Sequence, residues 1–236
     1  WPVYGGNAAG QRHSALAQID RANVDRLQPA WRFDAGPGDL QTSPLVIDGT
    51  LYATTPTQKV IALDAATGTL RWEFDPGASS EQPVRGLSWW SEGTEQRLFT
   101  SFNHYLGALD PQTGRPVASF GVDGRIDLRE GLGRDPAAIA AFLTSPGIVH
   151  EDLIITGFRT SEADPAAPGA VRAYDVRTGT LRWIFHLVPQ PGEAGHESWP
   201  ADAWKSVGGA NAWAGMVLDA MRGIVGRNVG LQRPHP

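Results

Sequence analysis

One short motif, Asp-x-x-Thr-Gly, recurs three times along this chain and constrains its fold more than any other feature. The copies begin at Asp64, Asp110 and Asp175, so they are 46 and 65 residues apart, and a weaker fourth register follows 44 residues later at Asp219. A four-stranded propeller blade repeats about every 40 to 50 residues. Two spacings therefore fit one blade each, and the long one contains an insertion over residues 121–142. The repeat predicts an all-β chain that forms a β-propeller.

Each copy is predicted to form a strand, a tight turn and a second strand, as over residues 60–74 and 171–185. The Asp carboxylate can accept hydrogen bonds from backbone amides of the turn, and the Gly supplies the positive φ. Trp72 and Trp183 follow the first and third turns, where an indole can cover a neighbouring blade. The middle copy has Ala118 at that position.

Two sister hairpins are predicted ahead of the first and third copies, over residues 43–55 and 145–157. One short helix is predicted over residues 135–142, where a Pro near the start precedes an Ala-rich stretch. A closed propeller needs about four or more blades, and we count three complete ones and the beginning of another. We therefore expect an incomplete ring of about three to four blades, whose open strand edges favour aggregation.

The composition excludes several classes of protein. With 41% hydrophobic residues the chain can bury a core, and its 28 Gly, 18 Pro and 9 Trp suit short strands joined by turns. The formal net charge of −5 comes without a basic stripe, which argues against nucleic acid as a partner. No apolar stretch approaches the roughly 20 residues that span a bilayer. The chain has no Cys, so disulfides and thiolate chemistry are excluded.

The blade motif resembles the tryptophan-docking motif of quinoproteins, which are dehydrogenases with an eight-bladed β-propeller that use pyrroloquinoline quinone (PQQ). The opening segment, residues 4–33, resembles the start of that family. Further segments resemble successive family segments in the correct order, namely residues 42–56, 85–90, 144–157, 169–183 and 204–216. The resemblance therefore covers residues 1–225 and implies an incomplete propeller of quinoprotein type.

Three segments are most similar to the branch of membrane-bound glucose and quinate dehydrogenases, namely residues 124–136, 185–200 and 208–216. The alcohol dehydrogenases of the family carry adjacent cysteines where this chain has Ser79 and Ser80. This difference argues against the alcohol branch.

The resemblance implies that the cofactors are PQQ and calcium. Glu162 matches the carboxylate ligand of calcium, an ion that prefers oxygen ligands. Trp213 matches the indole on which the quinone ring stacks, and Gly208 and Gly209 before it permit close backbone approach. Without the resemblance, Glu162 is an ordinary loop carboxylate and Trp213 an ordinary core residue.

Arg85 matches the arginine whose fork of donors hydrogen-bonds the cofactor, and the alternative role is a surface ion pair. Thr144 and Gln41 match two lesser polar contacts, although Gln41 stands where many relatives have Glu. Both side chains have the alternative of being satisfied locally. Arg159 occupies a site where a small polar residue contacts the cofactor in some relatives.

Residues 226–236 depart from the family pattern, which continues with an apolar strand. We therefore expect a partial propeller over residues 1–225 and a divergent tail over residues 226–236, as a frameshift or a truncation would produce. The family's catalytic base and a further metal ligand are expected beyond Pro236. The catalytic base is therefore unknown, and this chain alone is expected to be inactive.

The resemblance implies an oxidoreductase, the N-terminal portion of a PQQ-dependent dehydrogenase that oxidises a glucose-like sugar or polyol. Its electrons would pass to a membrane quinone or a cytochrome, and its location would be periplasmic or periplasm-facing. The alternatives are a noncatalytic propeller scaffold of the outer-membrane assembly type and a degraded gene product without function. A scaffold has no need of Glu162, Arg85 and Trp213 in register, so cofactor titration separates these hypotheses.

Overall fold

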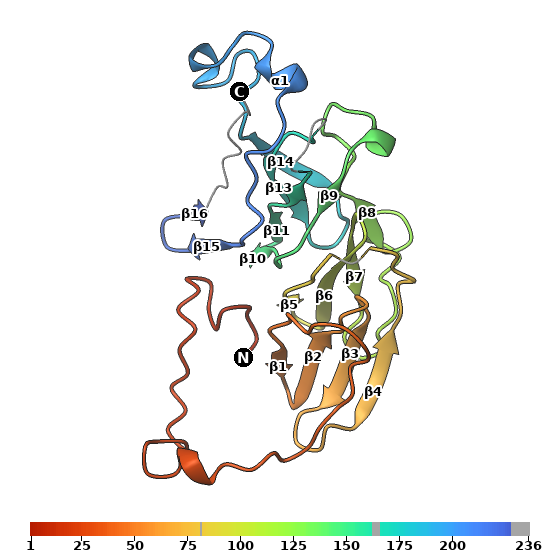
Figure 1. Cartoon of the computed structure of the whole chain (residues 1–236), viewed down its shortest axis with the longest axis vertical. Helices are drawn as coiled ribbons and strands as arrows, with labels where there is room; N and C mark the ends of the chain where they lie inside the picture. Colours follow the sequence, from red (N-terminus) through yellow and green to blue (C-terminus); the bar gives the residue numbers. More distant parts are fainter. Residues whose placement is uncertain (81, 162–165, 228–236) are drawn as a thin grey trace.

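The computed structural model describes residues 1–80, 82–161 and 166–227, and strands dominate it (Figure 1). Twelve of the strands form three four-stranded antiparallel sheets. The first sheet contains β1 (Leu45–Ile47), β2 (Thr50–Thr54), β3 (Val60–Asp64) and β4 (Leu70–Phe74). The second contains β5 (Ser88–Glu92), β6 (Glu95–Phe102), β7 (Tyr105–Leu109) and β8 (Arg125–Asp127). The third contains β10 (Ile148–His150), β11 (Leu153–Thr156), β13 (Ala170–Asp175) and β14 (Leu181–His186).

The remaining elements are short. β9 (Ala141–Phe142) pairs with β12 (Arg159–Thr160), and β15 (Met216–Asp219) pairs with β16 (Ile224–Arg227). Three 3-10 helices and one α-helix complete the described chain, namely Val24–Arg26, Pro136–Ala138, His196–Ser198 and α1 (Ala203–Ser206). No helix in the described ranges has the length and apolar character that crossing a membrane requires.

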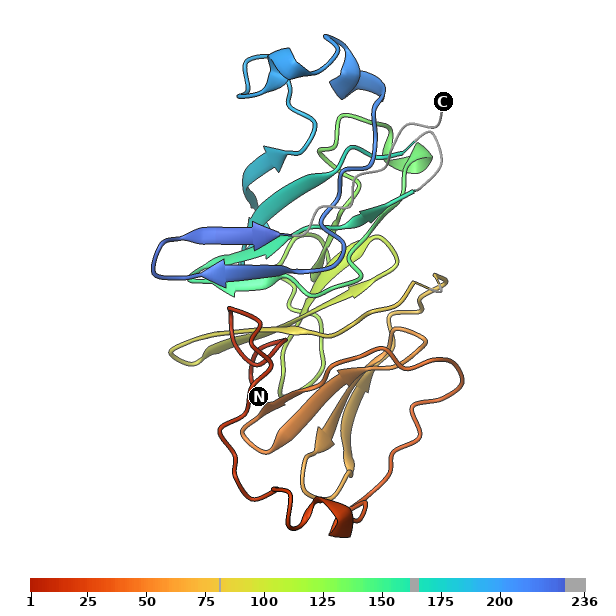
Figure 2. The same cartoon turned by 60° about the vertical axis from the view of Figure 1, so that its left-hand side comes forward.

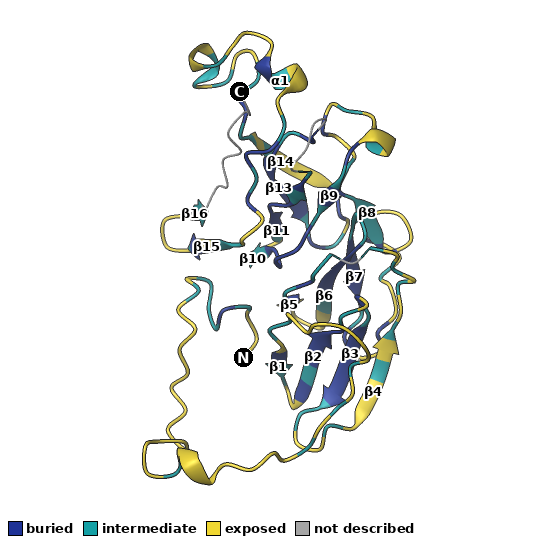
Figure 3. Ribbon diagram, in the orientation of Figure 1, coloured by how far each residue is buried: buried dark blue, intermediate teal, exposed yellow. Residues whose placement is uncertain are grey.

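The sheets stack face to face (Figure 2), and a bridge between Ser43 and Gly86 joins the segments ahead of β1 and β5. β10 contacts both β5 and β15, so the first strands surround a common axis. Large apolar side chains fill the space between sheets: Leu45, Leu98 and Leu109 join the first two, and Phe99 and Ile154 belong to the core of the next two. Figure 3 shows the middle strands buried and the outer strands β4 and β14 largely exposed.

The three Asp-x-x-Thr-Gly turns have nearly the same geometry. Oδ1 of Asp64 accepts hydrogen bonds from the amides of Ala66 and Thr67 at 3.1 and 3.0 Å. Asp110 and Asp175 hold their own turns in the same way, at 2.8 to 3.0 Å. The glycines have φ values of 72°, 71° and 72°. The predicted role of the motif as a turn between the third strand and the outer segment is confirmed.

A tryptophan from the preceding segment docks on each of the first two turns. Trp72 packs on Gly114, where an added Cβ would lie 2.5 Å from its ring, and its Nε1 donates to Pro111 O at 2.9 Å. Trp31 packs on Gly68 in the same manner, with an added Cβ 2.6 Å from its ring. Glycine is therefore required at these turns both for its positive φ and for contact with the indole.

The third turn and the third tryptophan depart from this pattern. The Gly179 turn is covered by Ile126 of β8 and by Phe120, which lies between β7 and β8, and these two take the place of the missing middle tryptophan. On β14, 38% of the Trp183 surface and 53% of the Phe185 surface are exposed. The flank of the third sheet is thus apolar along its outer strand.

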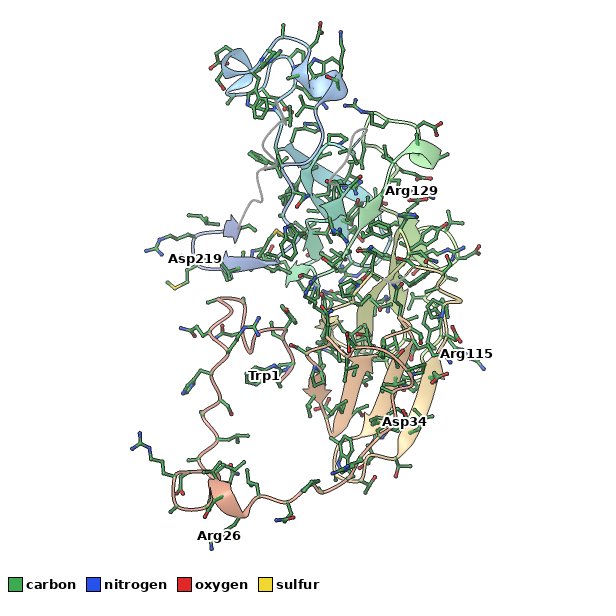
Figure 4. All side chains as sticks on the ribbon, viewed as in Figure 1. Trp1, Arg26, Asp34, Arg115, Arg129 and Asp219 are labelled. Carbon is green, nitrogen blue, oxygen red and sulfur yellow. The ribbon has the colours of Figure 1, made fainter. Side chains whose placement is uncertain are left out.

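Three predictions about elements were wrong. Asp219 ends β15, the first strand of its hairpin, so it corresponds to Asp48 after β1 and not to the motif aspartates after third strands (Figure 4). In the middle copy the outer strand is β8, which follows a further turn after the motif. The helix predicted over residues 135–142 is only the 3-10 turn Pro136–Ala138, capped by Asp135. The chain then enters β9, because Phe142 pairs with Arg159.

The divergent tail was predicted to lack strand character from residue 226. Gly226 and Arg227 instead complete β16, where they pair with Val217 and Met216. The rest of that segment, residues 228–236, lies outside the described residues. The domain boundary at residue 225 stays a prediction.

Replacing Gly114 with Ala should separate the docking contact from backbone strain. Gly49 has a φ of 74° with nothing within 4 Å of an added Cβ, whereas Gly114 has a φ of 71° under Trp72. We expect Gly49→Ala to lower the free energy of unfolding by about 1 kcal/mol from strain alone. Gly114→Ala should lower it by about 2 kcal/mol more because of overpacking. Urea unfolding measures both, and equal losses would contradict the docking role.

Acid should weaken the first turn through Asp64. The Arg71 side chain and the Thr67 amide and hydroxyl donate to this carboxylate and lower its pKa from 3.8 to about 2. Because the folded-state pKa lies below the unfolded one, the charged form stabilises the fold above about pH 4, and this contribution is lost toward about pH 2. The difference in Tm between the wild type and Asp64→Asn should therefore shrink as the pH falls. A difference that is constant with pH would argue against this.

Candidate functional site

Backbone hydrogen bonds join the segments that enter the first strands of successive sheets. The Ser43 amide donates to Arg85 O at 2.8 Å, and the Arg85 amide donates to Thr144 O at 3.0 Å. The hydroxyl of Thr144 then donates to Trp213 O at 3.3 Å. Each of these residues lies within four positions of β1, β5, β10 or β15. Three predicted cofactor residues, Arg85, Thr144 and Trp213, thus meet at one end of the axis although 128 positions separate the first from the last.

Arg85 and Trp213 form the centre of this cluster. The guanidinium carbon of Arg85 lies over the Trp213 ring, 5.4 Å from its centroid, which is within range of a cation–π interaction. Arg85 is half-buried, and 41% of the Trp213 surface is exposed. A guanidinium beside a partly exposed indole suits a flat anionic ligand, because an indole can stack on a ring and the cation neutralises carboxylates.

Two buried polar atoms next to these residues have no hydrogen-bond partner within the described chain. They are Oγ of Ser145, adjacent to Thr144, and Oδ1 of Asn211, two residues before Trp213. Nδ2 of Asn211 is used, since it donates to Thr160 Oγ1 at 3.1 Å. Because buried polar groups are normally paired, these two atoms fit a site that takes a polar ligand. Neither atom was predicted from the sequence, although Asn211 stands inside the segment that identified Trp213.

Two predicted residues are not brought into this cluster. Gln41 is exposed, and its side chain has no hydrogen-bond partner among the residues described. Glu162, the predicted calcium ligand, lies outside the described residues. The Gly208–Gly209 pair permits close approach as expected, but its neighbour is the chain itself. An added Cβ on Gly208 would lie 2.3 Å from the Cβ of Ala166, and the Gly209 amide donates to Ala167 O at 3.0 Å.

A second polar cluster lies at the end of β14 and in the segment that follows it. Nδ1 of His186 is 2.7 Å from Oε1 of Glu193, and the Gln190 amide donates to Oε2 of the same carboxylate at 2.8 Å. Burial opposes ionisation, but hydrogen bonds from Gln190 and His186 hold the pKa of Glu193 below its ordinary value. Across residues 1–80, 82–161 and 166–227, no group of three His, Asp or Glu side chains could hold a metal ion.

Stacked four-stranded antiparallel sheets around a common axis define the chain as part of a β-propeller. Residues 1–234 match the PQQ family described as "Glucose/ethanol/alcohol dehydrogenase, beta-propeller domain". The chain therefore belongs to this family of PQQ-dependent dehydrogenases. The predicted family is confirmed, and so is the all-β, incomplete propeller of quinoprotein type.

Relatives from more than one branch are similar to this chain. The quinate/shikimate dehydrogenase (quinone) of Acinetobacter baylyi is 29% identical over 260 residues, covering 95% of this chain and 32% of that protein. The dehydrogenase subunit of the alcohol dehydrogenase (quinone) of Gluconacetobacter polyoxogenes is 33% identical over 257 residues, covering 99% and 33%. The chain spans about a third of the length of these curated relatives. Overall identity does not separate the two branches.

Solved structures agree with the family. The quinohemoprotein alcohol dehydrogenase ADHIIG of Pseudomonas putida superposes with a TM-score of 0.80 at 28% identity, over 98% of this chain and 34% of that one. The quinohemoprotein alcohol dehydrogenase of Comamonas testosteroni gives a TM-score of 0.77 at 26% identity, over 94% and 34%. The arrangement of the sheets is therefore that of the corresponding third of such propellers.

Ser145→Ala should test whether the site keeps an unpaired polar atom for a ligand. Because Oγ of Ser145 has no partner in the described chain, its removal should leave the free energy of unfolding unchanged or raise it by up to about 1 kcal/mol. Ser101→Ala is the matched control, since that buried hydroxyl donates to Leu143 O at 2.6 Å. It should cost about 1 to 2 kcal/mol. Equal losses in urea unfolding would show that Ser145 is satisfied in the protein.

Proposed function

We propose that this chain provides one side of the PQQ site of a dehydrogenase that oxidises a sugar or polyol hydroxyl. The observation that carries the proposal is the Arg85 guanidinium over the exposed Trp213 ring, beside Thr144. These are the positions that resemble the family's cofactor contacts. When bound, PQQ supplies an orthoquinone that accepts a hydride from the alcohol carbon.

The chain's own residues bind and orient the cofactor in this proposal. Trp213 supports one face of the ring, and the Arg85 fork pairs with a carboxylate. Oγ of Ser145 and Oδ1 of Asn211 offer the polar contacts that are unused within the described chain. Thr144 positions the indole by its hydrogen bond to the Trp213 carbonyl. Glu162 is proposed as a calcium ligand on the family resemblance alone.

The finer parts of the proposal concern the substrate, the electron acceptor and the location. Ser79 and Ser80, in place of adjacent cysteines, favour the glucose and quinate branch, and thus a cyclic polyol, over the alcohol branch. A membrane quinone or a cytochrome is the proposed acceptor, and the periplasm the proposed location. The proposed activity belongs to a longer protein that contains this chain. The matched relatives are about three times as long as the chain.

PQQ should bind saturably to the chain in the presence of calcium, as measured by calorimetry and by quenching of tryptophan fluorescence. Arg85→Gln should weaken binding about tenfold or more, because a charge-assisted hydrogen bond contributes about 1.5 to 3 kcal/mol. Trp213→Leu should also weaken it, through loss of the stacking face. Arg115→Gln is the control, since this exposed side chain, labelled in Figure 4, follows the second motif turn and is not part of the cluster. Equal binding by all four proteins would contradict the proposed site.

A further inference from the structure

Residues 1–12, called the axial segment below, lie beside the first strands of the sheets and are drawn in red in Figures 1 and 2. The Val46 amide on β1 donates to Trp1 O at 3.0 Å. The Leu218 amide on β15 donates to Ala8 O at 2.9 Å. The axial segment therefore ties β1 to β15, although the sheets that contain β5 and β10 lie between these strands in the sequence.

A cavity of about 390 Å³ lies between the axial segment and the backbone of the proposed cofactor site. Part of its lining comes from the axial segment, including Tyr4 and Gly5. Another part comes from residues that follow the three predicted cofactor residues by one or two positions, namely Leu87, Pro146 and Ala214. The axial segment is therefore placed to support all three segments that form the cluster.

Tyr4 packs directly on the residue that follows Arg85. An added Cβ on Gly86 would lie 2.9 Å from Cδ2 of the Tyr4 ring and 3.1 Å from Ser43 O. Only a residue without Cβ permits both contacts at once. The guanidinium carbon of Arg12 lies 5.6 Å from the centroid of the Tyr4 ring, within range of a cation–π interaction. The ring is therefore held within the axial segment and pressed against Gly86.

The contact between Tyr4 and Gly86 bears on the direction of the Arg85 side chain. The amide and the carbonyl of Arg85 are both hydrogen-bonded to neighbouring segments. Packing of the Tyr4 ring on the next residue further restricts the backbone at this point. A guanidinium that is already held over Trp213 loses less conformational entropy when a ligand binds, so the affinity for the ligand is higher.

We infer that the axial segment supports the cofactor site, with Tyr4 as a positioning residue that acts through Gly86 on the direction of Arg85. This inference rests on the proposed function. The contribution of Tyr4 to the affinity for PQQ passes through the Arg85 guanidinium. The ring carbons Cδ2 and Cε2 face Gly86, so the contact needs the ring and not the hydroxyl.

The test is a double-mutant cycle on the affinity for PQQ, measured by calorimetry with calcium. Tyr4→Ala should weaken binding about fivefold in the wild-type background, because the ligand must then order Arg85 itself. In the Arg85→Gln background the same change should weaken binding by less than about twofold, since the guanidinium that Tyr4 positions is absent. Tyr4→Phe should match the wild type, because the ring contact is kept.

Trp1→Ala is the matched control within the axial segment. The Trp1 ring packs on Gly6, where an added Cβ would lie 2.9 Å from it, and not on the residue after Arg85. This variant should lower the Tm, because packing is lost, and leave the affinity for PQQ within about twofold of the wild type. If Tyr4→Ala does not fold, Tyr4→Leu takes its place in the cycle, since it keeps much of the apolar volume without the flat ring.

The outcomes separate this inference from the proposed function. An equal loss of affinity on Tyr4→Ala in both backgrounds would show that Tyr4 acts independently of Arg85, which overturns the inference. A loss of affinity in Trp1→Ala as large as that in Tyr4→Ala would assign the effect to general loosening and also overturn it. Wild-type affinity in Tyr4→Ala with weak binding by Arg85→Gln would remove the role of Tyr4 and leave the site in place. Absence of saturable binding by the wild type would overturn both.

Discussion

The contact between an indole and a glycine turn is the interaction on which this structure depends. The Asp carboxylate fixes each turn from within, so its glycine presents a flat, side-chain-free surface. Trp72 spans from one sheet to the next by packing on that surface and donating to Pro111 O. Trp31 makes the same contact on Gly68, whereas between the second and third sheets Ile126 and Phe120 cover the Gly179 turn in place of an indole.

The candidate site follows from that stacking. Sheets related by a common axis bring the starts of their first strands to one end, and each contributes one residue there. The ladder from Ser43 through Arg85 to Thr144 is made of backbone bonds, so it fixes the segments whatever their side chains are. The side chains at these positions do not form the backbone bonds, and here they include a cation beside an indole. This division between scaffold and site lets relatives with different substrates share one fold.

Local patterns in the sequence predicted the strands and turns well, because a hairpin is determined by residues a few positions apart. The prediction that Asp219 begins a fourth copy of the motif was wrong, because an Asp followed by a turn also occurs after a first strand, as at Asp48. The helix over residues 135–142 failed because pairing with Arg159 competes with local helix propensity. Arg85, Thr144 and Trp213 were found by resemblance alone, while the unpaired atoms of Ser145 and Asn211 were missed because burial depends on the folded chain.

The docking of Trp31 covers the first turn from the segment ahead of β1, so the two flanks of the stacked sheets differ. Each of the three Asp-x-x-Thr-Gly turns is already covered, by Trp31, by Trp72 or by Ile126 with Phe120. Because Trp31 lies ahead of β1, the first of these turns is covered by the N-terminal segment and not by a strand of another sheet.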